Sequence, residues 1–178
     1  MQIARCPPAY LLGLAGGCPT LGDLMTLCEE NFVLLCRLAP HLKDQREVSV
    51  SRRKGSVDLF LRIEEQSRYT SLIRLTHYFP CSDREPSVDC GGGLTGLRAD
   101  PDARLRIYHD ARQVEVLDLR QTVLPLCTDY QRPALDAKWR VNLFLGKWLA
   151  FCLHQGHRFG PAAALPLPEG GDLVDTLT

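Results

Sequence analysis

The chain of 178 residues has the length of one domain, and its 45% hydrophobic and 24% charged residues are ordinary for a globular protein. Its 21 basic and 21 acidic residues balance, which leaves no basic surplus for a duplex-binding face and argues against a nucleic-acid partner. No run approaches the roughly 18 apolar residues of a membrane span, so no membrane partner is expected either.

Residues 1–19 are expected to form a loosely ordered N-terminal extension. Their apolar run, Ala9–Ala15, is short and follows two prolines, which makes a poor secretion signal. The 8 cysteines include no C-x-x-C pair, so we expect reduced thiols in a cytoplasmic protein. The cysteines in apolar helical stretches are expected to act as small buried hydrophobes. These are Cys28, Cys36 and Cys152.

The first regular element is a helix predicted over Leu21–Ala39. Thr20 and Asp23 have the spacing of a capping box, and Pro40 ends the helical pattern. Leucines recur at helical spacing along one face, and Asn31 interrupts them.

Five segments in the middle of the chain alternate apolar and polar residues, as half-buried strands do. They begin near Val48, Val57, Tyr69, Leu105 and Val114. The links between them are short, which favours antiparallel pairing, with Lys54–Ser56 as one hairpin turn. Residues 80–102 contain three consecutive glycines and no periodicity, so we predict a mobile loop insertion there.

A second helix is predicted over Asp136–Gln155, with Asn142 on its apolar face and Gly156 closing it in a left-handed conformation. Residues 160–178 are expected to form a frayed tail. The predicted fold class is α+β, with a single domain over residues 20–159. Its order is α-β-β-β-β-β-α, a five-stranded antiparallel meander packed against an N-terminal and a C-terminal helix.

Four strings of the sequence occur together in a familiar order: Leu27–Phe32, Ser67–Thr70, Arg106–Ala111 and Asn142–Leu145. In this combination the chain resembles the YqiB-like family of uncharacterised proteobacterial proteins, a domain-of-unknown-function family. The resemblance covers about Leu21 to His157, and the N-terminal extension and the loop at 80–102 look longer here than in typical members. It implies a small cytosolic domain and brings no catalytic residues.

Asn31 and Asn142 each place a carboxamide on an apolar helix face, where an unbonded amide costs roughly 1–3 kcal/mol. In one interpretation, each amide ties its helix to the sheet backbone or to a buried water. In the other, the helices lie side by side and the amides help to line a polar pocket.

Two further groups of residues are of the types that carry out acid–base catalysis or bind metal ions. Tyr108-His109-Asp110 joins a histidine to a carboxylate, the residue types of acid–base catalysis, although neighbours in a strand point to opposite faces and Asp110 is a natural turn former. Cys152, His154 and His157 are zinc-ligand types, but about 200° of helix rotation separates the first two, so no metal and no cofactor are predicted.

The leading hypothesis is a non-enzymatic binding or adaptor domain that holds a protein partner or a small anionic ligand in a sheet–helix cleft. Its candidate binding residues are Asn31, Arg106, Tyr108, His109, Lys138 and Asn142. The alternative is a small hydrolase or transferase with His109 as general base and with Arg106 and Lys138 binding an anion. A carboxylate bonded to His109 in a closed pocket with Arg106 would favour the enzyme, and an exposed His109 on a turn would disfavour it.

Overall fold

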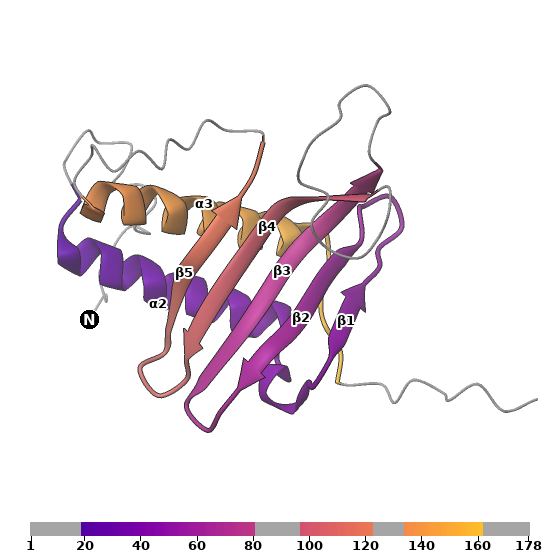
Figure 1. Ribbon diagram of the computed structural model, residues 1–178, viewed down its shortest axis with the longest axis horizontal. Helices are drawn as coiled ribbons and strands as arrows, with labels where there is room; N and C mark the ends of the chain where they lie inside the picture. Colours follow the sequence, from indigo (N-terminus) through magenta and orange to yellow (C-terminus); the bar gives the residue numbers. More distant parts are fainter. Residues whose placement is uncertain (1–18, 81–96, 123–133, 162–178) are drawn as a thin grey trace, which may run out of the picture.

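The computed structural model describes residues 19–80, 97–122 and 134–161. Two helices and five strands carry the architecture, with a short 3-10 helix, η1, after the first helix (Figure 1). In chain order the elements are α2 (Leu21–Leu38), η1 (Leu42–Asp44), β1 (Val48–Ser51), β2 (Leu59–Gln66), β3 (Thr70–Pro80), β4 (Leu97–Tyr108), β5 (Gln113–Arg120) and α3 (Ala134–His154).

The five strands form one sheet in the order β1-β2-β3-β4-β5, and every neighbouring pair is antiparallel. Helices α2 and α3 lie side by side across one face of this sheet, and the strands slant across them in Figure 1. The predicted fold class, element order and meander topology are therefore confirmed.

The core lies between the sheet and the two helices. Alternate residues of the strands point into it, as the period of two requires. They include Leu59, Leu61, Ile73, Leu75, Leu105, Ile107 and Val114, all buried. Leu35 and Leu38 of α2 and Leu145 and Leu149 of α3 meet them from the other side.

Both predicted helix-end signals are present. The backbone N–H of Asp23 donates to the Thr20 hydroxyl at 3.2 Å, and the Thr20 N–H donates to the Asp23 carboxylate at 2.9 Å, which completes the capping box of α2. Gly156 follows α3 with φ of 81°. The His157 N–H then reaches the Cys152 carbonyl at 3.0 Å, the pattern of a left-handed helix stop.

The segment after α3 holds the helix layer to the β1 side of the sheet. The N–H of buried Phe159 donates to the Leu38 carbonyl at 2.8 Å, and the N–H of Arg158 donates to the Ser51 hydroxyl at 3.1 Å. The side-chain amide of buried Gln45 donates to the Gly160 carbonyl at 3.0 Å. Residues 156–161 thus form a strap that fixes the end of α2 against β1 (Figure 1).

The predicted limits of the loop at 80–102 are wrong. Pro80 ends β3 and pairs with Leu97, where β4 begins, so residues 97–102 are strand. Asp100 is buried there and accepts hydrogen bonds from the N–H and hydroxyl of Thr122. The first half of β4 contains buried polar residues that are bonded to specific partners. Its sequence therefore lacks the alternation of apolar and polar residues by which the other strands were predicted. Residues 81–96 lie outside the described part.

The face of the sheet away from the helices carries ion pairs between strands. Arg74 binds Asp102 through two hydrogen bonds of 2.8 Å each, and Arg104 binds Glu64 at 2.6 Å. Both arginines therefore already have a carboxylate partner on this surface.

Candidate functional site

The two carboxamides on the apolar helix faces lie together between α2 and α3. Asn31 is 0% exposed, and its side-chain N–H donates to the backbone carbonyl of Asn142 at 3.0 Å. The side-chain N–H of Asn142 donates in turn to the Lys138 carbonyl at 2.9 Å. The side-chain oxygen of Asn142 accepts a hydrogen bond from the Cys28 thiol at 3.7 Å. The helices do lie side by side, but the amides bond one helix to the other, an arrangement in neither of the two sequence interpretations.

A glycine of α3 makes this close approach possible. The Asn31 side-chain oxygen is buried without a hydrogen-bond partner among the described residues. It packs against Gly146 so closely that a Cβ at that position would lie 2.7 Å from it. The Asn31 carboxamide therefore fills the space between the helices.

Three other candidates gather around Glu115 on the edge strand β5. The Tyr108 hydroxyl donates to Glu115 at 3.1 Å, and the Lys138 ammonium lies 3.7 Å from the other carboxylate oxygen. Arg106 is directly opposite Glu115 in the β4–β5 register. Glu115 occupies the centre of this group, where it already binds the Tyr108 hydroxyl and the Lys138 ammonium. From the sequence, Glu115 is expected only as one of several charged strand residues that form cross-strand ion pairs on a solvated sheet face.

His109 is separated from that group. It follows β4 on the helix-facing side, with Ile107, whereas Arg106 belongs to the opposite face. Its ring Nε2 is 2.8 Å from the Ser71 hydroxyl, and its backbone N–H donates to the Tyr69 carbonyl at 2.8 Å. No carboxylate within the described ranges hydrogen-bonds to the ring. His109 is half-buried, so it meets neither the condition set for the enzyme nor the one set against it.

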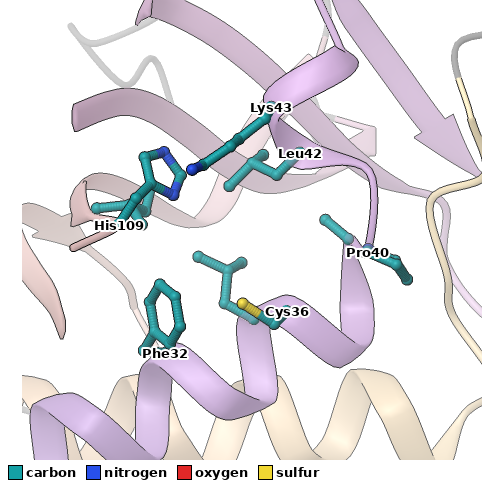
Figure 2. Close-up of a pocket in the computed structure, with 9 residues that line it drawn as sticks. Phe32, Cys36, Pro40, Leu42, Lys43 and His109 are labelled. Carbon is teal, nitrogen blue, oxygen red and sulfur yellow. The ribbon is translucent and has the colours of Figure 1, made fainter. Parts of the chain in front are cut away.

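A pocket of about 170 Å³ opens beside His109, between α2, η1 and the end of β4 (Figure 2). Most of its wall is apolar, and the polar groups are confined to a lysine, a histidine and a thiol. The lining consists of Phe32, Leu35, Cys36, Ala39, Pro40, Leu42, Lys43, Ile107 and His109. In Figure 2 the Lys43 side chain extends over the pocket, and its ammonium group faces the imidazole of His109.

Positive charge reaches this pocket from two elements. Burial lowers the pKa of His109, and Lys43 lowers it further, while Asp110 acts weakly in the opposite sense. Partial desolvation against the pocket wall raises the pKa of the Cys36 thiol, against the opposing effects of Arg112 and Lys43. Neither Lys43 nor Arg112 forms an ion pair within the described parts of the chain. The pocket therefore combines an apolar wall with one lining cation, Lys43, that has no ion-pair partner among the described residues.

Sequence reasoning missed most of this pocket. Lys43 lies in a short turn with no periodicity, Arg112 in a hairpin turn, and Ser71 contacts His109 only because β3 and β4 are neighbours. Cys36 was predicted to be buried, and this is wrong, because it is exposed on the surface of α2. The hydroxyl of Ser71 belongs to a residue that is 0% exposed, so it cannot reach a substrate as a nucleophile would.

A second polar cluster lies under β1 and the strap. The Nδ1–H of His77 donates to the Asp58 carbonyl at 3.0 Å, so its Nε2 is left to accept the Cys152 thiol at 3.8 Å. His157 lies between two serine hydroxyls, 3.1 Å from Ser51 and 3.0 Å from Ser56.

Burial lowers the pKa of both His77 and His157, which keeps the pair of rings neutral. Of the three residues considered for zinc, Cys152 and His157 are buried in this cluster and His154 is exposed. Across the described ranges, no group of three or more histidine, cysteine or acidic residues is arranged to hold a metal ion.

No helix within the described ranges is both long enough and apolar enough to cross a membrane.

Comparison with known proteins identifies relatives over most of the chain. The sequence is 31% identical over 153 residues to the uncharacterized protein YqiB of Escherichia coli strain K12, which covers 84% of this chain and 96% of YqiB. The YqiB proteins of E. coli O6:H1 strain CFT073 and of E. coli O157:H7 match with the same identity and coverage. No solved structure matches the chain significantly.

Residues 34–158 match the family described as "Protein of unknown function (DUF1249)". This segment contains β1 to β5, η1, α3 and the end of α2, and with them most of the pocket lining. The resemblance inferred from the sequence strings is confirmed, and the chain belongs to the DUF1249 family, together with YqiB.

Proposed function

We propose that this protein is a non-enzymatic binding domain that holds a small anionic ligand in the pocket between α2, η1 and β4. The observation that carries the proposal is the position of the Lys43 ammonium, which faces His109 over an apolar wall without a carboxylate partner among the described residues. A ligand pocket commonly combines an apolar lining with a few polar groups that orient the ligand.

The volume and lining of the pocket limit the size of the ligand. An apolar protein cavity of roughly 150 Å³ accommodates benzene, and this pocket has about 170 Å³. Phe32, Leu35 and Leu42 would contact the apolar body of such a ligand, and Lys43 would bind its charge. A carboxylate on a body the size of one aromatic ring fits this arrangement. Cytoplasmic placement agrees with the free thiols of Cys28, Cys36 and Cys152.

Benzoate and its neutral isostere benzamide test the proposal. Benzoate should shift the amide NMR signals of Phe32, Leu42 and Lys43 in the ¹⁵N-labelled protein, and benzamide should bind more weakly by up to about fivefold, because an exposed charge pair contributes up to about 1 kcal/mol. Lys43→Met should weaken benzoate binding by a similar factor. Lys54→Met, which removes an exposed ammonium from the β1–β2 turn, is the matched control and should leave the affinity unchanged.

Equal affinity for benzoate and benzamide would contradict the proposal. So would an equal loss of affinity in Lys43→Met and Lys54→Met, because the effect would then reflect net charge and not the pocket.

A further inference from the structure

We propose, building on the function proposed above, that the pocket takes up its anion together with a proton, which binds to the imidazole of His109. The anion would lie between the Lys43 ammonium and the newly formed imidazolium, in contact with both. Binding of the anion and protonation of His109 would then strengthen each other.

The contacts of His109 suit both protonation states. Its Nε2 is 2.8 Å from the Ser71 hydroxyl, and a hydroxyl either donates to a neutral ring nitrogen or accepts from a protonated one. Ser71 is buried and has no other side-chain hydrogen bond within the described ranges, so its hydroxyl is free to change direction. The second ring nitrogen, Nδ1, forms no hydrogen bond inside those ranges and is left for a ligand.

Burial first, and then the charge of Lys43, lower the pKa of His109 and favour the neutral ring. Lys43 faces it from η1, and the uncharged thiol of Cys36 belongs to α2. In the turn after β4, Asp110 opposes Lys43 only weakly, and its exposed carboxylate accepts the N–H of Ala111 at 2.9 Å. From β3, the neutral hydroxyl of Ser71 hydrogen-bonds to the ring.

An anion bound beside Lys43 favours the protonated form of the His109 ring. It cancels the positive potential that Lys43 exerts on the ring and adds an attractive partner for an imidazolium, so it raises the pKa of His109. The free protein starts with a pKa below the ordinary value near 6.5, and the complex has a higher one. Between these two values the affinity for the anion must increase as the pH falls, by up to about tenfold per pH unit.

The experiment is a benzoate titration by calorimetry at about pH 7 in Bis-Tris and in Tris, two cationic buffers whose different heats of protonation report the number of protons exchanged and which cannot compete with benzoate as anions. The wild-type protein should take up a fraction of one proton per benzoate, and its affinity should rise about tenfold between about pH 8 and pH 6. His109→Gln should abolish both effects. His154→Gln, which changes an exposed histidine of α3 away from the pocket, should retain both.

A second measurement does not depend on a variant folding. The imidazole signals of His109 in the wild-type protein, followed by NMR through a pH titration, should give a higher pKa when benzoate is saturating. Benzoate binding with no proton uptake and an unmoved His109 titration would overturn the inference and leave the proposed function intact. An absence of benzoate binding at every pH would overturn both.

Discussion

The contact between Asn31 and Gly146 leads to a prediction in which one substitution has opposite effects in two backgrounds. Gly146→Ala places a methyl group 2.7 Å from the Asn31 side-chain oxygen. The carboxamide cannot turn away freely, because Asn31 is buried and donates to the Asn142 carbonyl at 3.0 Å, and breaking that bond costs about 0.5–1.5 kcal/mol.

The expected magnitude follows from two opposing effects. Overpacking a buried contact costs about 1–3 kcal/mol, whereas replacing glycine by alanine inside a helix contributes about 1 kcal/mol of stability. In the wild-type background, Gly146→Ala should therefore lower the free energy of unfolding by about 1 kcal/mol. In an Asn31→Ala background the nearest remaining atom is the Leu27 methyl at 4.0 Å. There the same substitution should raise the free energy of unfolding by up to about 1 kcal/mol.

The double-mutant cycle consists of the wild-type protein, Gly146→Ala, Asn31→Ala and the double variant. Urea denaturation of these four proteins, followed by far-UV circular dichroism, measures their free energies of unfolding. The coupling between the two positions should be about 1–3 kcal/mol, with unchanged dependence on urea concentration. If Gly146→Ala changes the stability by the same amount in both backgrounds, within about 0.5 kcal/mol, then the carboxamide does not fill the space between the helices as the structure indicates.

Two further predictions concern stability. Because burial lowers the pKa of His77 and His157 in the folded state, the unfolded chain binds more protons near pH 6, so the melting temperature should fall as the pH drops from about 7 to about 5. His157→Gln should reduce that fall, and a melting temperature independent of pH in this range would argue against buried neutral rings. Asp102→Asn, which disrupts a bidentate pair of a buried carboxylate with Arg74, should cost about 1–3 kcal/mol in urea denaturation. Glu64→Gln, in the more exposed pair with Arg104, should cost less than about 1 kcal/mol, and the reverse order would show that burial does not set the strength of these pairs.

The elements of this fold could be predicted because the signals for them are local. Thr20 and Asp23 cap α2, Gly156 stops α3, and the alternation at the start of β2 follows from one buried sheet face. Short links between strands then leave little choice but an antiparallel meander. The same reasoning failed for residues 97–102, because Asp100 and Asp102 are satisfied by Thr122 and Arg74, partners that are distant in the sequence.

The sequence alone therefore predicted the two helices, the strands apart from residues 97–102, the fold class and the family, because periodicity and end signals act over a few neighbouring residues. Only the tertiary structure decided which side chains meet. It paired Lys138 of α3 with Glu115 of β5, and it brought Lys43 of η1 to the imidazole of His109. The first contact depends on how α3 packs beside β5, and the second on how η1, α2 and the end of β4 pack against one another; no pattern along the chain encodes either arrangement.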